Sequence, residues 1–189
     1  LAAGSNPKVW ERLQTFGHVI VSPVPSLFTF NIKDARIKEL PGVAAQVTVK
    51  VKDTKLTSTG PLLITHWGMS GPAILKLSAW GARILHDKNY QFTIFVNWLN
   101  DAEKEEVEKK LKELKKENAK KTVYKKSHFE LTNRLWESLV LASGIENETK
   151  WADLSKIQLQ NLVNQLINGT FQVNGKSTFK EEFVTAGGI

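Results

Sequence analysis

The residues with the clearest chemical potential form one run from Thr65 to Ala73, which reads Thr-His-Trp-Gly-Met-Ser-Gly-Pro-Ala. The pattern predicts a strand that ends at a glycine-rich turn, followed by a helix that starts near Pro72. Free backbone N–H groups at such a start favour an anion or an electron-rich ligand edge. His66, Trp67 and Ser70 are therefore the candidates for a catalytic role, with the catalytic residue itself unassigned. The alternative is structural: Ser70 caps the helix, the glycines make the turn and Trp67 packs.

Other residue types that commonly carry chemistry are absent or isolated. The chain has no cysteine, which excludes disulfides, thiolate catalysis and cysteine-ligated metal sites. We expect structural roles for His18, His86 and His128, and no metal site, because neither HExxH nor another paired-histidine spacing occurs. GxGxxG and the P-loop pattern are also missing, so the chain holds no complete nucleotide-binding unit. Redox chemistry would therefore need a bound cofactor.

The charge balance is basic: 26 Lys and Arg against 19 Asp and Glu give a formal net charge of +7. This excess raises nucleic acid as an alternative partner. The run 101–118 holds six Lys but seven Asp and Glu, so the unopposed group comes later, at Lys120, Lys121, Lys125 and Lys126. Because no RNA-binding aromatic motif accompanies this group, we interpret it as a solvated loop and expect no nucleic-acid partner. No apolar run approaches the roughly 18 to 20 residues of a membrane span, so we expect a soluble, cytoplasmic protein.

The first 99 residues predict a short helix followed by strands. The helix is expected from Pro7 to Phe16 with Asn6 as its cap, and a strand at 18–22. The two prolines of segment 22–26 cannot donate backbone hydrogen bonds, so a bend or a sheet edge is expected there. Apolar and polar residues then alternate in four strands, interrupted by a helix at 72–85. The strands are Leu27–Ile32, Ala45–Val51, Leu62–Thr65 and Tyr90–Leu99.

Residues 100–169 predict three helices, each with a capping pair at its start. The pairs are Asn100 with Glu103, Ser127 with Glu130, and Ser155 with Gln158. The chain then returns to alternating residues, and the turn Asn174-Gly175 predicts a hairpin between 170–173 and 176–179. The predicted fold class is therefore α+β: a small, mostly antiparallel β-barrel with an inserted three-helix subdomain.

Both ends of the sequence meet small residues. Leu1–Ser5 reads Leu-Ala-Ala-Gly-Ser, and Phe183–Ile189 reads Phe-Val-Thr-Ala-Gly-Gly-Ile. Glycines in such runs let the backbone approach a ligand or another strand closely, while the structural alternative is two frayed termini. Leu1 is not an initiator Met and no secretory signal follows it, so we expect a segment of a longer protein.

Four motifs occur in the same order in the BaiN/YhiN-like flavoproteins, also called the aminoacetone-oxidase-like FAD-binding family, which the chain resembles over its whole length. They are Leu1–Ser5, Gly17-His18 with Pro23–Leu27, Thr65–Ala73 with Leu77-Ser78, and Val184–Gly188. In that family, a Rossmann-type FAD domain is interrupted by a β-barrel and a small unit that resembles a helix-two-turn-helix module. The resemblance implies that 1–22 is a stub of the FAD domain with a lead-in helix and that 184–189 is a second stub. It places the barrel at 23–99 and 170–183, and the helical subdomain at 100–169.

The resemblance also implies a function. The chain would be an internal part of an FAD-dependent oxidoreductase, in which the insert shapes the substrate side of the flavin site and NAD(P)H is a candidate electron donor. The turn Thr65–Pro72 would face the flavin and a small-molecule substrate. In the full-length protein, FAD contacts are implied for Ala3, Gly4, Ser5, Thr185, Ala186, Gly187 and Gly188. Without the two halves of the FAD domain as partners, the chain is expected to be inactive and to bind FAD weakly. The alternatives are a basic nucleic-acid-binding module that uses the four lysines above, and a pure interaction domain.

Overall fold

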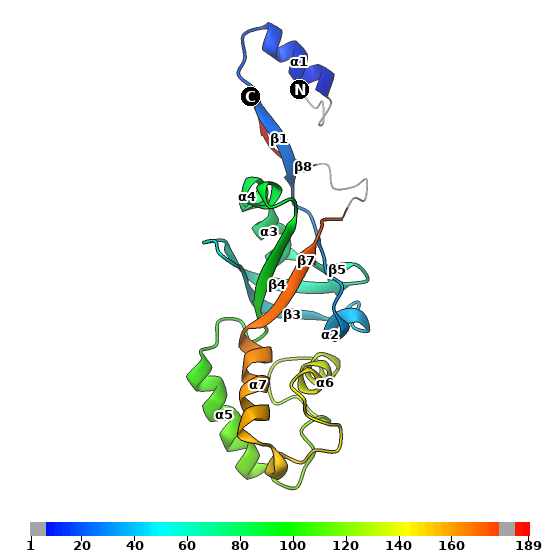
Figure 1. The fold of residues 1–189 in the computed structure, drawn as a ribbon, viewed down its shortest axis with the longest axis vertical. Coiled ribbons are helices and arrows are strands. Elements are labelled where there is room, and N and C mark those ends of the chain that lie inside the picture. Colours follow the sequence, from blue (N-terminus) through cyan, green and yellow to red (C-terminus); the bar gives the residue numbers. More distant parts are fainter. Residues whose placement is uncertain (1–6, 178–183) are drawn as a thin grey trace.

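The computed structural model describes residues 7–177 and 184–189, and the fold is mixed α+β as the sequence predicts. Figure 1 shows three parts along the longest axis. A two-stranded ribbon with helix α1 (Pro7–Thr15) lies at one end, a β-barrel lies in the middle, and a helical unit lies at the other end. The run Thr65–Ala73 belongs to the barrel part.

The barrel is one six-stranded sheet with the strand order β2-β5-β4-β3-β6-β7, in which every neighbouring pair is antiparallel. Apolar and polar side chains alternate along its strands. In β3, Val47, Val49 and Val51 are fully buried in the barrel, while the side chains between them face outward. Phe30 and Phe92 also lie inside, with ring centres 5.1 Å apart and edge to face. The strands are β2 (Phe30–Asn31), β3 (Ala44–Val51), β4 (Thr57–Thr65), β5 (Gly68–Ser70), β6 (Gln91–Asn97) and β7 (Gly169–Asn174).

The predicted strands at 45–51 and 90–99 are confirmed with small shifts, whereas the other two differ in extent. Strand β4 begins at Thr57 rather than at Leu62. Only the two residues of β2 remain from the predicted strand 27–32, and Leu27, with a φ of 54°, separates this segment from the strand that ends at Ser26.

The barrel nearly closes where the end of β7 meets β2. The backbone N–H of Asn31 donates to the carbonyl of Gly175 at 3.0 Å, and the Asn31 side chain donates to the carbonyl of Lys176 at 2.9 Å. The predicted hairpin around Asn174-Gly175 is therefore wrong, because Gly175, with a φ of 137°, carries the chain across to β2. Strand β7 pairs with β6 instead, and Lys176 pairs with Phe30. The last two residues of that predicted strand, 178–179, lie outside the described residues.

The ribbon pairs β1 (Val21–Ser26) with β8 (Val184–Gly188) in antiparallel register. The proline segment thus lies in a strand that pairs on one side, which confirms the predicted sheet edge. The strand predicted at 18–22 begins only at Val21. Helix α1 is confirmed, while its predicted cap Asn6 lies outside the described residues. The ribbon brings together the described segments that precede and follow the barrel.

Two short helices, α3 (Pro72–Trp80) and α4 (Ala82–Asp87), pack on the barrel and on β1. The single helix predicted at 72–85 is wrong, because the structure breaks it at Gly81. A Cβ at Gly81 would lie 2.6 Å from Leu56 Cδ1 and 2.9 Å from the carbonyl oxygen of Leu77. The β3–β4 hairpin, which carries Leu56, therefore approaches this point too closely for a side chain.

The helical unit contains α5 (Lys104–Glu117), α6 (Asn133–Ala142), a 3-10 helix at Trp151–Asp153 and α7 (Lys156–Ile167). Trp136 and Trp151 stack at its centre with ring centres 6.5 Å apart, and Trp136 Nε1 donates to the Val123 carbonyl at 2.9 Å. The longest helix, α5, has 14 residues. Among the described residues, no helix combines the length and apolar character needed to cross a membrane.

Of the three predicted capping pairs, the pair Ser155 with Gln158 is confirmed as a capping box. Helix α5 has Glu103 rather than Asn100 at its N-cap position, without a side-chain cap hydrogen bond, and Asn100, with a φ of 63°, belongs to the preceding turn. Helix α6 is capped by Thr132 rather than Ser127. The hydroxyl of Ser127 bonds instead to the backbone two residues later, so this local turn takes the place of a helix start.

Candidate functional site

The turn between β4 and β5 carries His66 and Trp67 at its tip. Thr65 fixes the turn, since its Oγ1 accepts hydrogen bonds from the backbone N–H groups of Trp67 at 3.3 Å and Gly68 at 3.2 Å. The backbone N–H of Ile32 donates to the Trp67 carbonyl at 2.9 Å, which ties the turn to the segment after β2. His66 is exposed, and Trp67 retains 60% of its accessible surface. The turn therefore presents an imidazole and an indole to solvent.

Ser70 lies away from this tip, because the predicted glycine-rich turn covers only His66 and Trp67, and residues 68–70 lie beyond it. These residues form strand β5, which pairs with both β4 and β2. Gly68 permits the close pairing, since a Cβ there would lie 2.2 Å from the carbonyl oxygen of Phe30. Helix α3 begins after Gly71, which provides no side-chain cap, so Ser70 does not cap the helix. The structure brings two of the three candidates together and separates Ser70 from them along β5.

An open hollow of about 360 Å³ adjoins the tip, between the turn and helix α2 (Ala35–Lys38). Thr65 and His66 line it from the turn, and Lys33 and Lys38 line it from the other side. Both lysines are exposed. Two ammonium groups beside an imidazole suit a phosphate or another anion. Sequence reasoning missed both lysines, because nothing local in the sequence relates them to His66.

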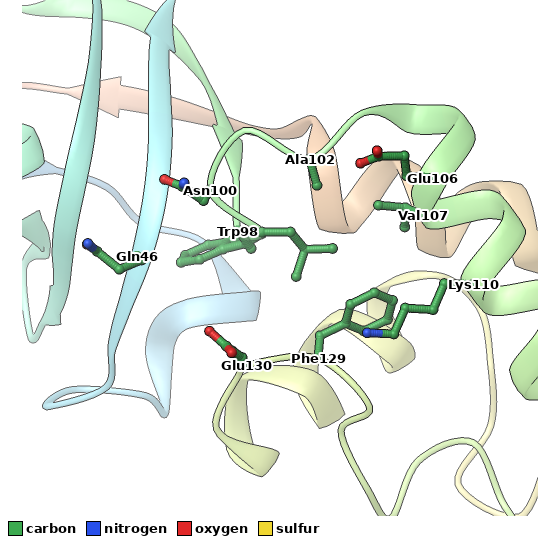
Figure 2. A pocket seen from close by; sticks show the side chains of 10 residues that line it. Gln46, Trp98, Asn100, Ala102, Glu106, Val107, Lys110, Phe129 and Glu130 are labelled. Atoms are coloured by element: carbon green, nitrogen blue, oxygen red, sulfur yellow. The ribbon is translucent and has the colours of Figure 1, made fainter.

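A second pocket, between the barrel and the helical unit, was also not predicted. Figure 2 shows it between the end of β6, the start of α5 and Phe129, and its volume is about 340 Å³. Buried Trp98 and Val107 contribute to its apolar lining, and Lys110 Nζ lies 4.6 Å from the centre of the Phe129 ring. Gln46 of β3 also lines it, so the lining combines residues far apart in the sequence and no short pattern predicts it. Within 7–177 and 184–189, no three His, Asp or Glu side chains are grouped so that they could hold a metal ion.

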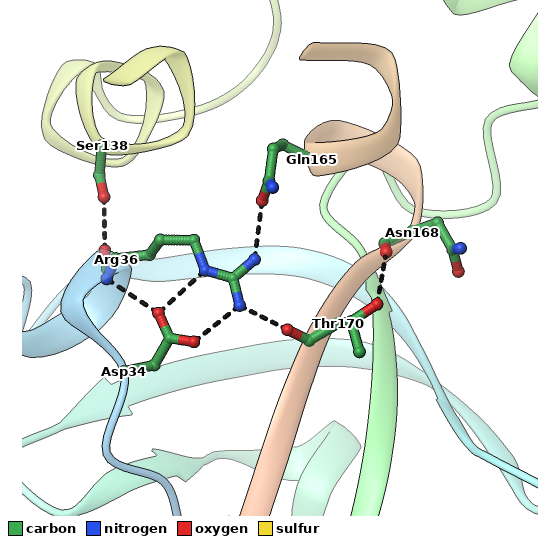
Figure 3. Close-up of polar contacts among 6 residues, drawn as sticks. All are labelled: Asp34, Arg36, Ser138, Gln165, Asn168 and Thr170. Carbon is green, nitrogen blue, oxygen red and sulfur yellow. Dashed lines mark hydrogen bonds and ion pairs between the residues drawn. The ribbon is translucent and has the colours of Figure 1, made fainter. Parts of the chain in front are cut away.

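Arg36 on α2 joins the barrel to the helical unit, as Figure 3 shows. Its guanidinium donates to both carboxylate oxygens of Asp34 at 2.9 and 2.7 Å, to Gln165 Oε1 on α7 at 2.7 Å and to the carbonyl of Thr170. It also lies 3.9 Å from the centre of the Phe171 ring. Burial favours a higher pKa for Asp34, but the hydrogen bonds and the charge of Arg36 outweigh it, so the pKa of Asp34 is lowered. The charge of the Asp34 carboxylate is thus balanced by Arg36, and the hollow beside His66 remains basic because of Lys33 and Lys38.

The lysine group that the sequence left unopposed lies near His128 in the helical unit. Burial, and then the charges of Lys126, Lys121 and Lys110, lower the pKa of His128, and Glu117 partly offsets them. Lys110 of α5 therefore acts on His128 together with Lys121 and Lys126 of the loop that follows this helix. The nucleic-acid-binding alternative based on this group stays a prediction.

The glycines of β8 face neighbouring backbone and a tryptophan ring. A Cβ at Gly187 would lie 2.8 Å from the carbonyl oxygens of Val21 and Ser22, and one at Gly188 would lie 3.4 Å from the Trp10 ring. The close backbone contact at Gly187 and the φ of 123° at Gly188 account for these two glycines, and the FAD contacts implied for this strand stay a prediction. Four residues with implied FAD contacts lie on this strand, namely Thr185, Ala186, Gly187 and Gly188. Three others lie outside the described residues, namely Ala3, Gly4 and Ser5.

Exposed apolar side chains are frequent around the ribbon and the helices packed on it. Phe16, Val19 and Ile189 each retain at least 70% of their accessible surface, and Trp80 at the end of α3 retains 80%. Exposed apolar groups that lie together can form an interaction surface. We call the set the ribbon-end apolar surface; its members are Phe16, Val19, Val21, Trp80, Ile84, Val184 and Ile189.

Comparison with known proteins matches residues 24–184 to a family described as the HI0933-like protein barrel and H2TH domain. The chain belongs to the HI0933-like family. The match spans the strands and helices of the barrel and the helical unit, and it confirms both the predicted fold class and the resemblance to the BaiN/YhiN-like flavoproteins. Because it belongs to this family, the HI0933-like chain is related to flavoproteins.

One curated relative of the HI0933-like chain is a Haemophilus influenzae protein named ribosomal RNA dihydrouridine synthase. The two are 27% identical over 188 residues. The alignment covers 98% of this chain and 44% of the relative, so the chain spans less than half of the relative's length.

Proposed function

We propose that this chain is the barrel and helical part of a flavin-dependent enzyme that converts uridine in ribosomal RNA to dihydrouridine. The similarity to a ribosomal RNA dihydrouridine synthase over 98% of the chain carries the proposal. It favours a base in RNA over the small-molecule substrate that the family resemblance implied. The reaction is a two-electron reduction: a hydride, which reduced FAD would supply, and a proton add across the C5–C6 double bond of uracil.

The part of the protein beyond this chain would supply the main FAD-binding unit, since the sequence contains no GxGxxG motif. The relative's greater length is compatible with such a part. The ribbon-end apolar surface is the docking face that we assign to it, because β1 and β8 lead into and out of the barrel at that end. A cytoplasmic location, where ribosomal RNA is found, belongs to the same proposal.

The tip of the β4–β5 turn is the part of this chain that we place at the substrate. Of the three candidates, His66 can transfer a proton, and the exposed Trp67 ring can stack on a base. Lys33 and Lys38 line the hollow beside His66, where they can neutralise phosphates that flank the base. Ser70 lies further along β5, and we assign it no part in proton transfer.

His66→Gln in the whole protein tests this assignment. Loss of a proton-transfer group should slow dihydrouridine formation about a hundredfold or more, measured by mass spectrometry of nucleosides from treated ribosomal RNA. His86→Gln is the matched control, because His86 is also exposed but lies at the end of α4 beside Asp87. If both variants form dihydrouridine at the same rate, His66 takes no part in the chemistry.

A further inference from the structure

The outward faces of four neighbouring barrel strands, β4, β3, β6 and β7, carry no carboxylate. Side chains there alternate with buried ones and are hydroxyl, amide, apolar or lysine groups. Several already bond to one another across the strands, such as Thr48 with Thr59 at 2.8 Å and Thr93 with Gln172 at 3.0 Å. An acid-free face of this size stands out in a chain with 19 Asp and Glu.

Cations gather at one end of this face, where the β3–β4 hairpin begins. Lys50, Lys52, Lys55 and Phe95 line an open hollow of about 590 Å³, together with Asp53 and Thr54. The three lysines are exposed, and within 7–177 and 184–189 none of them forms an ion pair. Half-buried Phe95 lies directly opposite Lys50 in the β3–β6 register. We call this surface the lysine–threonine face; it comprises Thr48, Lys50, Lys52, Lys55, Thr93 and Phe95.

The distribution of charge singles out the barrel. Residues 21–99 hold nine Lys and Arg and four Asp and Glu, a net charge of +5 out of the chain's +7. Residues 100–169 hold thirteen basic and twelve acidic residues, so the lysines of the helical unit are almost fully balanced. The barrel therefore carries most of the chain's net positive charge, which favours a polyanionic partner on this part of the molecule.

We infer that the lysine–threonine face binds a single-stranded stretch of the RNA substrate. Lys50, Lys52 and Lys55 contact phosphates, the Phe95 ring stacks on a base, and the threonine hydroxyls bond to ribose 2′-OH groups and base edges. An acidic peptide would use the lysines but leave the aromatic ring and the hydroxyls without a role. The inference rests on the proposed function for its choice of RNA. It adds a second surface, which binds the RNA at nucleotides distant from the base that reacts.

Fluorescence anisotropy of the 189-residue chain with a labelled oligouridine of about 12 nucleotides tests the inference. The variant K50Q/K52Q/K55Q should bind about tenfold or more weakly near 0.1 M salt, and the slope of log affinity against log salt should become shallower by about 2. The control K109Q/K112Q/K116Q removes the same charge from exposed positions on α5 and should change affinity far less. Phe95→Leu, which keeps an apolar side chain in the half-buried site, should weaken binding about fivefold or more through lost stacking.

Circular dichroism first establishes that each variant is folded. Equal weakening by the two lysine variants, or a Phe95→Leu variant that binds like the wild type, would overturn the inference. Competition by heparin or duplex RNA as strong as that by single-stranded RNA would overturn it too. The binding assay contains no cofactor or reductant, so its outcome is separate from that of the proposed function. Weak RNA binding together with intact dihydrouridine formation would refute the face alone, and the reverse result would refute the reaction alone.

Discussion

Replacing Arg36 with Met tests how the barrel and the helical unit are held together. The substitution keeps an unbranched side chain but removes the guanidinium that donates to Asp34, Gln165 and the carbonyl of Thr170. It also removes the cation that lies over the Phe171 ring. Asp34 would remain as a carboxylate that is 23% exposed, without its counter-ion.

The expected cost follows from these contacts. Removing one partner of a buried ion pair costs about 3–5 kcal/mol. The side chains of Arg36 and Asp34 are 16% and 23% exposed, so solvent screening lowers this figure, while the lost bonds to Gln165 and Thr170 raise it by about 1 kcal/mol each. We expect the free energy of unfolding to fall by about 3 kcal/mol, which lowers the thermal midpoint by roughly 6–12 °C.

Urea unfolding followed by tryptophan fluorescence measures this loss. The control is Arg134→Met, since exposed Arg134 donates to the carbonyl of Glu39, and its loss should cost less than about 1 kcal/mol. The pKa of Asp34 is lower in the folded protein than in the unfolded chain. The ion pair with Arg36 therefore stabilises the folded protein fully at pH values above the ordinary Asp pKa of about 3.9, and this stabilisation is lost as the pH falls through the lowered pKa. The difference between wild type and Arg36→Met should therefore narrow in strong acid. An Arg36→Met variant no less stable than Arg134→Met would refute the reasoning.

Three further changes test other parts of the structure. Gly68→Ala should lower the free energy of unfolding, measured in urea, by about 3 kcal/mol or more, because the added Cβ would overlap the Phe30 carbonyl. The control Gly42→Ala should lower it by only about 1–2 kcal/mol, because Gly42 has a φ of 87° but open space around it. Similar losses in the two variants would contradict the close packing at Gly68. The pKa of His128 is lowered in the folded protein, so the unfolded chain takes up that proton first as the pH falls. Stability should therefore decrease as the pH falls through the ordinary His value of about 6.5 and level off below the lowered pKa, and it should decrease less in His128→Phe; identical pH profiles would exclude His128 as a cause. Trp80→Lys should leave the thermal midpoint of this chain nearly unchanged but lower that of the whole protein, and an equal effect on both would argue against docking at Trp80.

Local patterns in the sequence predicted the elements that depend on neighbouring residues. The capping box of Ser155 and Gln158 sets the start of α7, and the valines of β3 set its buried face. The same kind of cap pattern failed at Ser127, where the hydroxyl bonds into a short turn. Whether such a hydroxyl begins a helix or a turn depends on how the following residues pack, and the pattern does not contain that information.

The parts that the sequence did not predict depend on residues far apart along the chain. Strand β5 exists because Gly68 admits the backbone of Phe30, and the barrel closes because Asn31 meets Gly175. The hollow beside His66 needs α2 to lie against the β4–β5 turn. Motif reasoning selected His66 and Trp67 as candidates, but it grouped Ser70 with them, because a turn and a short strand are hard to distinguish in a glycine-rich run.

Dihydrouridine in the ribosomal RNA of Haemophilus influenzae is the measurement that tests the central proposal most directly. A strain without its own ribosomal RNA dihydrouridine synthase would be complemented with the whole protein that contains this chain. Mass spectrometry of nucleosides from purified ribosomal RNA then reports the modification. We predict that the wild-type protein restores dihydrouridine and that His66→Gln does not. Ribosomal RNA that still lacks dihydrouridine, in cells where the wild-type protein accumulates in folded form, would contradict the proposed function.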